Sequence, residues 1–136
     1  MRASILTTAA ALASSAIAAP LEARKTYAIW SAKNVTTEVS HIIVGATFNL
    51  DVPAGYIAGA PAFNVTCSVD ILDQKTVPCT WNGPQAAGST VETAFFVNEV
   101  DITVYHTFGS TTATGYSGDL EYNADFTLDV TSVVTA

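Results

Sequence analysis

Residues 62–81 read AFNVTCSVDILDQKTVPCTW and contain both cysteines, one of two N-glycosylation sequons and the clearest strand pattern of the chain. From Phe63 to Ile71 an apolar residue occupies every second position, and polar residues fill the positions between them. An alternation of period two predicts a strand with one buried face and one solvated face. A polar turn at residues 73–75 follows, so Cys67 and Cys79 are expected to bridge neighbouring strands.

The N-terminus has the features of a secretory signal peptide, which we assign to residues 1–19. Arg2 supplies a positive charge, and residues 5–17 form an apolar, small-residue stretch that ends at a small-residue cleavage site. This stretch is too short to span a membrane, and Pro20 follows it directly. We therefore expect a secreted, extracellular protein.

The residues after the signal peptide allow two interpretations. Residues 20–25 end in the basic pair Arg24-Lys25, so they are either a pro-segment cut by a processing protease or an ordinary exposed tail. In both cases residues 26–136 are long enough for one domain and too short for two.

An oxidising compartment makes a disulfide the expected state of the two cysteines. Cys67 and Cys79 allow one intrachain bridge, and the alternative is a bridge between two chains. Asn34 begins a sequon between two strand patterns, which suits an exposed loop that carries a glycan. Asn64 begins the second sequon and lies on the polar face of its strand, where a glycan would point to solvent.

The rest of the chain also reads as strands. β-branched and aromatic residues prevail, turn signals recur every eight to twelve residues or so, and no window shows the spacing of an amphipathic helix. This combination predicts an all-β, single-domain antiparallel β-sandwich or β-barrel. The loop at residues 51–61 is long and rich in proline and glycine, so it is a candidate functional loop. The expected strands cover residues 26–33, 39–50, 63–71, 91–97, 100–108, 111–117 and 120–130.

The net charge of the chain argues against two classes of partner. The chain has a formal net charge of −7, which argues against nucleic acid and anionic membrane as partners.

His106 is in phase with apolar neighbours and is expected to face inward or to end a strand, whereas His41 is expected to be exposed. No nucleophile elbow, zinc-protease motif or phosphate-binding loop is present, so the sequence predicts no enzyme and no cofactor. The spacing of four acidic residues does not match a calcium loop, so no metal site is expected at Asp70, Asp73, Glu99 and Asp101.

Four aromatic residues are candidates for contact with a ligand or a partner. They lie in expected loops or on expected outer faces, where aromatic side chains bind sugars or flat polyphenols and anchor protein interfaces. Burial in the core is the alternative for the two tryptophans. The four candidates are Trp30, Tyr56, Trp81 and Tyr105.

Three segments resemble the Alternaria major allergen family of small secreted fungal proteins. They are the start Ala19-Pro20-Leu21-Glu22-Ala23-Arg24, the motif Phe63-Asn64-Val65-Thr66-Cys67-Ser68 with the later Cys79, and the strands from Ile102 to Tyr122. The resemblance implies a compact β-barrel or sandwich without a catalytic site, in which Cys67 and Cys79 form the structural bridge. Well-known members carry further cysteines, one of them for a covalent dimer. This chain has only the central pair, so we expect a monomer or a non-covalent dimer.

The resemblance also implies a function. Members of the family act as effectors, plant-defence elicitors or allergens, and some bind flavonoid-like ligands or plant defence proteins. We therefore expect a non-enzymatic fungal effector or elicitor that binds a host plant protein or a small aromatic ligand. A cell-wall carbohydrate-binding or small-ligand-binding module is the alternative, and the candidate aromatic residues motivate it.

Overall fold

The computed structural model describes residues 25–73 and 75–136. The expected signal peptide and nearly all of the pro-segment lie outside the described residues. Within them the chain forms nine strands. The strands are β1 (Ala28–Ser40), β2 (Ile42–Val52), β3 (Phe63–Asp70), β4 (Val77–Pro78), β5 (Thr80–Trp81), β6 (Ser89–Phe96), β7 (Asp101–Phe108), β8 (Thr111–Tyr116) and β9 (Phe126–Thr135).

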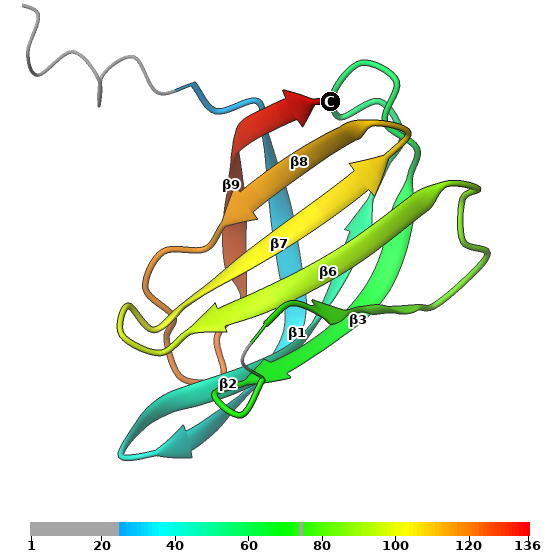
Figure 1. The fold of residues 1–136 in the computed structure, drawn as a ribbon. Coiled ribbons are helices and arrows are strands. Elements are labelled where there is room, and N and C mark those ends of the chain that lie inside the picture. Colours follow the sequence, from blue (N-terminus) through cyan, green and yellow to red (C-terminus); the bar gives the residue numbers. More distant parts are fainter. Residues whose placement is uncertain (1–24, 74) are drawn as a thin grey trace, which may run out of the picture.

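All nine strands belong to one antiparallel sheet, in the order β4-β6-β7-β8-β9-β1-β2-β3-β5. The sheet curls until its two ends, β4 and β5, meet within one short segment of chain, which makes a nearly closed barrel (Figure 1). The expected all-β antiparallel fold is confirmed. No helix among the described residues is long and apolar enough to cross a membrane.

The barrel closes at residues 77–81, which we call the seam. Val77 pairs with Thr93 of β6, whereas Trp81 pairs with Val65 of β3, so the segment passes from one free edge of the sheet to the other. Cys79 lies between these pairings and forms the disulfide with Cys67 of β3. The expected intrachain bridge is therefore confirmed, and its position ties the seam to β3.

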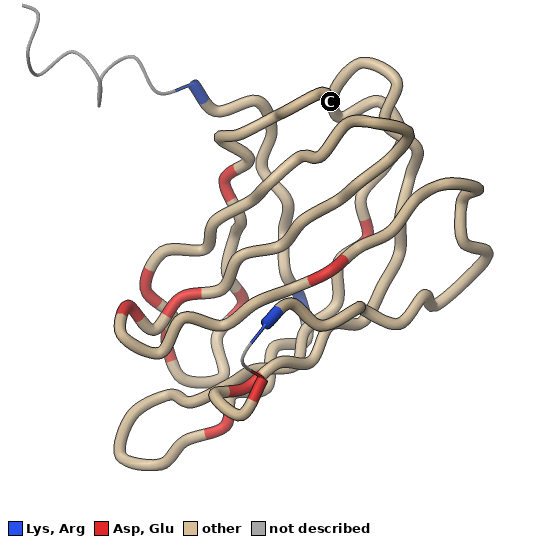
Figure 2. Tube along the Cα trace, viewed as in Figure 1, with Lys and Arg blue, Asp and Glu red and all other residues tan. Residues whose placement is uncertain are grey.

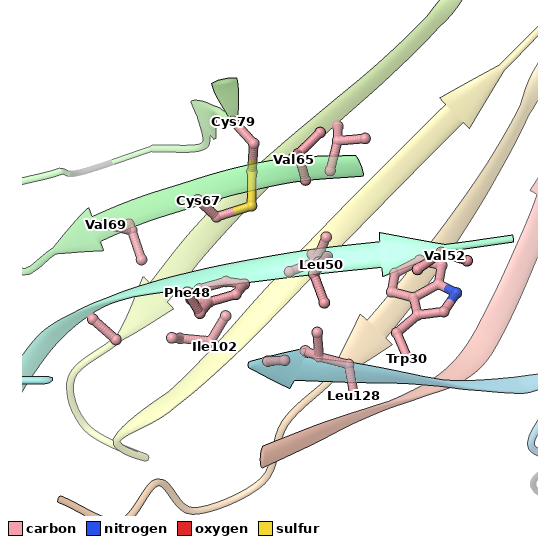
Figure 3. Packing of buried hydrophobic residues seen from close by; sticks show 14 of the residues in the cluster. Trp30, Phe48, Leu50, Val52, Val65, Cys67, Val69, Cys79, Ile102 and Leu128 are labelled. Carbon is pink, nitrogen blue, oxygen red and sulfur yellow. A yellow bond between two sulfur atoms is a disulfide. The ribbon is translucent and has the colours of Figure 1, made fainter. Parts of the chain in front are cut away.

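Alternating residues of the long strands fill the inside of the barrel (Figure 3). In β3 the four residues from Phe63 to Val69 that share the predicted apolar face are all buried, and the residues between them face outward. Full burial of a large apolar side chain contributes about 1.5–3 kcal/mol, so this core is the main source of stability. Its largest apolar members are Trp30, Phe48, Phe63, Leu50, Ile102 and Leu128.

The first strand is longer than expected, and the first sequon does not lie in a loop. Asn34 is within β1, where the register with β2 shifts between Lys33 and Thr36. Asn34 has a φ of 55°, in the left-handed region that asparagine tolerates better than most residues. The prediction of a loop was wrong because a β-bulge absorbs the break in alternation and the strand continues.

The second strand begins later than expected. The chain turns at His41, which has a φ of 67° and is exposed as predicted. Ile42 is exposed, as is Val39 on the other strand of the turn. Both lie at the tip of the β1–β2 hairpin, which projects beyond the body of the barrel (Figure 1).

The last strand is displaced relative to the prediction. The expected strand at residues 120–130 starts only at Phe126 and continues to Thr135. Asn123 has a φ of 48°, and its Oδ1 accepts a hydrogen bond of 2.8 Å from the Thr37 backbone amide. The alternating pattern continues through this turn, so alternation alone did not reveal where the strand begins.

Candidate functional site

His106 lies at the centre of a polar cluster inside the barrel. Its side chain is fully buried, with Nδ1 2.6 Å from the Tyr56 hydroxyl and Nε2 2.9 Å from the Ser89 hydroxyl. Burial lowers the pKa of His106 to about 4 and raises that of Tyr56, because it disfavours the charged form of each. Of the two positions expected for His106, the inward one is confirmed.

The Ser89–His106 contact has the atoms of a nucleophile and its base, but substrate cannot reach it. Ser89 is 1% exposed and His106 is 0% exposed. A catalytic nucleophile has to meet its substrate in an accessible cavity. We therefore interpret the cluster as structural: its hydrogen bonds satisfy polar groups in an apolar interior.

Trp30 is not a surface residue, which corrects its selection as a contact candidate. It is 1% exposed and packs edge-to-face against Tyr56 and Phe63, with ring centroids 5.3 and 5.4 Å away. Trp30 lies on the inward face of β1 because its strand position is in phase with Ala32. Its Nε1 has no hydrogen-bond partner among the described residues.

Tyr56 also turns inward, although it belongs to the loop that we selected as functional. Its hydroxyl reaches His106, and its ring packs against Trp30 and Phe63. The loop is further closed by a backbone hydrogen bond from Gly55 to Ala60. Tyr56 is therefore an anchor that holds this loop over one end of the barrel, rather than a contact for a ligand.

The other two aromatic candidates differ from each other. Trp81 is half-buried at the seam and packs against the core, so it offers little free surface. The aromatic basis for the carbohydrate-binding alternative is weaker for this reason. Tyr105 lies on the outer face of β7 and contributes to an open pocket.

This pocket, which we call the acid-rimmed pocket, has a volume of about 390 Å³. Its floor is the outer face of β6 and β7, and Ile71, Asp73, Lys75 and Thr76 form one wall. Aromatic and aliphatic side chains line it together with two acidic residues, Asp73 and Glu99, and one basic residue, Lys75. The lining residues are Ile71, Asp73, Lys75, Thr76, Ala94, Phe95, Phe96, Val97, Asn98, Glu99 and Tyr105.

The end of the barrel that carries the acid-rimmed pocket is rich in acidic residues. In Figure 2 the acidic residues gather toward the end where β6 turns into β7, away from the C-terminus. Burial raises the pKa of Asp101 next to the pocket, and the nearby Glu99 and Asp119 raise it further. Burial also raises the pKa of Tyr105, with a smaller contribution from Tyr116. The lining carries two acidic side chains and one basic side chain, so acidic charge prevails around the apolar floor.

A second hollow, of about 470 Å³, lies on the outer face of β1, β2 and β3 and beside Asn82, which follows β5, and we call it the amide groove. Both sequon asparagines, Asn34 and Asn64, lie in it, although 30 positions separate them in the sequence. All of its lining residues are polar or charged. They are Ser31, Lys33, Asn34, Asn49, Asp51, Asn64, Thr66 and Asn82.

Sequence reasoning missed residues of both sites, although it contained signals for each. In the run Phe95-Phe96-Val97 an alternating strand cannot bury three consecutive apolar side chains, and Phe96 and Val97 are both exposed. Asn49 lies between Phe48 and Leu50 in an alternating segment, which is the signal of an outward position, but the residues beside it across the sheet depend on strand order and register.

No cluster of His, Cys, Asp or Glu within residues 25–73 and 75–136 has the arrangement to hold a metal ion. No protein-family model, no curated protein and no solved structure matches this chain.

Proposed function

We propose that this protein is a secreted, non-enzymatic effector or elicitor that binds a host protein through the acid-rimmed pocket. The observation that carries the proposal is the cluster of exposed apolar side chains in and beside that pocket. Leu72 is 81% exposed, and Ile71, Phe96 and Val97 are also exposed. Contiguous apolar surface surrounded by polar groups is typical of protein contact sites.

Charge indicates the kind of partner. The pocket carries Asp73 and Glu99 against one basic residue, Lys75, and acidic residues gather at this end of the molecule (Figure 2). Complementary charge accelerates encounter and favours the correct partner. A host protein with a basic rim around an apolar projection therefore fits better than an acidic or purely polar one. The resemblance to secreted fungal effectors and elicitors supports a plant host.

The closed Ser89–His106 cluster supports binding rather than catalysis, because neither side chain is accessible. The disulfide supports an extracellular location, since such bonds persist in oxidising compartments.

The test is infiltration of purified protein into plant leaves, followed by measurement of the oxidative burst. The variant Leu72→Asp/Phe96→Asp places two charges on the apolar surface without entering the core, because both side chains are exposed. Val134→Asp is the matched control, since Val134 is 61% exposed on β9 and lies outside both hollows. Circular dichroism checks that all three proteins are folded.

We expect a burst from the wild type and from Val134→Asp, and at least a tenfold weaker burst from the double variant. Silence of the wild type across several plant species, or full activity of the double variant, would contradict the proposal. A titration with the flavonoid quercetin tests the alternative hypothesis that the pocket binds a small aromatic ligand. Binding of quercetin that Leu72→Asp/Phe96→Asp abolishes, without any burst, would replace the host protein by a small aromatic ligand.

A further inference from the structure

We infer that the amide groove is a binding site for a pyranose sugar, with the amide side chains as the groups that recognise its hydroxyls. This inference does not depend on the proposed function, because the amide groove and the acid-rimmed pocket share no residue. Its volume of about 470 Å³ is within the usual range of small-molecule sites, roughly 300–1,000 Å³.

The groove is organised by four side-chain hydrogen bonds that follow one another across the sheet. Asn34 Nδ2 donates to Asn49 Oδ1 at 2.9 Å, and Asn49 Nδ2 donates to Thr66 Oγ1 at 2.6 Å. Thr66 Oγ1 then donates to Asn82 Oδ1 at 2.9 Å, and Asn82 Nδ2 donates to Asn64 Oδ1 at 3.0 Å. Because each side chain holds the next, the amide planes are oriented before any ligand arrives.

These bonds leave binding capacity at each amide. An asparagine side chain has two N–H donors and an oxygen that can accept twice. In this row Asn49 and Asn82 each donate once and accept once, so each keeps one N–H and one lone pair for a ligand. A sugar hydroxyl both donates and accepts, so a row of such amides matches successive hydroxyls of a pyranose.

Other ligand classes fit the groove less well. Phosphate groups are bound by several cationic donors, but Lys33 is the one basic side chain in the lining, and it lies 4.0 Å from the carboxylate of Asp125. Calcium sites use several carboxylates, and Asp51 is the one carboxylate of the lining. An apolar ligand would leave the amides without partners, which is costly.

Two sources of a sugar fit the groove: the protein's own N-linked glycan and a free oligosaccharide. Asn34 and Asn64 are sequon acceptors within the groove itself, so the first sugar of an N-linked glycan would be tethered beside Asn49 and Asn82. A free oligosaccharide is the other source. N,N′-diacetylchitobiose is a suitable probe because it is the disaccharide that begins an N-linked glycan.

The experiment uses two preparations of the chain, both labelled with ¹⁵N. The first is secreted into the bacterial periplasm and carries no N-glycan, and it is titrated with N,N′-diacetylchitobiose. The second is secreted by a eukaryotic host and is examined with its glycan attached. In both, NMR follows the side-chain amide signals of Asn49 and Asn82.

Shifts of these signals in the first preparation would establish a site for free oligosaccharide. Asn49→Ala and Asn82→Ala should then each weaken binding about tenfold or more, while Thr90→Ala, an exposed change on β6, should not. Glycan-to-amide contacts in the second preparation alone would assign the groove to the protein's own glycan. Absence of both signals would overturn the inference.

Discussion

At the scale of single residues, His106 makes stability depend on pH. Its pKa is lowered to about 4 in the folded chain from an ordinary value of 6.5, so the unfolded chain binds a proton more readily between these values. The stabilisation is complete above pH 6.5 and is lost as the pH falls toward 4. We expect the free energy of unfolding to decrease by roughly 3 kcal/mol across this window.

Urea unfolding at a series of pH values measures this effect. His106→Gln is the comparison, because glutamine keeps a donor and an acceptor near Tyr56 and Ser89 but does not titrate. The variant should be less stable than the wild type at pH 7. Its free energy of unfolding should change less between pH 6.5 and 4. Other titrating groups, such as Asp101 with its raised pKa, are common to both proteins. Equal pH dependence in both would exclude His106 as the cause.

Gly45 is required by a close approach between two strands. A Cβ at this position would lie 2.6 Å from the Asp70 Cβ and 2.7 Å from the Val69 carbonyl oxygen. Because the backbone of β3 cannot move without breaking its pairing with β2, we expect Gly45→Ala to destabilise the protein by about 2–3 kcal/mol. Gly83→Ala is the control, since nothing lies within 4 Å of its added methyl group. Chemical denaturation that ranks the two variants equally would contradict this account.

At the scale of elements, the seam depends on the disulfide. β4 and β5 have two residues each, so their own pairing contributes little. The bridge closes a loop with a sequence separation of 12, which stabilises by about 3 kcal/mol in the chain-entropy model. We expect Cys67→Ala/Cys79→Ala to lower the melting temperature by roughly 10 °C.

Calorimetry and amide hydrogen exchange check this prediction. The amide of residue 79, which donates to the Val91 carbonyl at 2.9 Å, should exchange faster in the double variant as the seam opens. Reductant should destabilise the wild type and leave the double variant unchanged. An unaltered melting temperature would mean that strand pairing alone closes the barrel.

The loop between β2 and β3 should depend on its tyrosine anchor. Tyr56→Phe removes the hydroxyl 2.6 Å from His106 Nδ1 and leaves a buried nitrogen without its partner. The expected cost is about 1–2 kcal/mol, together with faster exchange of the Gly55 and Ala60 amides. Tyr122→Phe serves as the control, because Tyr122 is 67% exposed. Unchanged exchange in Tyr56→Phe would mean that ring packing alone holds the loop.

At the scale of the whole molecule, one sheet encloses one core, so unfolding should be cooperative. Trp30 reports on the core and Trp81 on the seam. We expect the urea midpoints from tryptophan fluorescence and far-ultraviolet circular dichroism to coincide. The variant Trp81→Phe isolates the Trp30 signal, and its two midpoints should also coincide. An earlier fluorescence transition in the wild type alone would show that the seam opens before the core.

Local pattern predicted much of the fold. The alternation from Phe63 to Val69 predicted β3 and its buried face, and the expected strands at residues 100–108 and 111–117 correctly separated β7 from β8. Alternation did not predict the strand boundaries at two asparagines. At Asn34 a β-bulge interrupts the alternation of apolar and polar residues but the strand continues, and at Asn123 the alternation continues although the chain turns. In both places asparagine takes a left-handed conformation, which a count of apolar positions does not detect.

The two candidate sites could not be predicted from the sequence, because each depends on which distant residues become neighbours in the folded chain. Composition and spacing alone established an all-β chain, an acidic surface and a pair of cysteines suited to one bridge, because these depend on residue type and local periodicity. Tertiary structure decided that Trp30 and Tyr56 point inward and that Asn34 and Asn64 share one groove. Such neighbourhoods arise from strand order and curvature, which bring together residues that are distant in the chain.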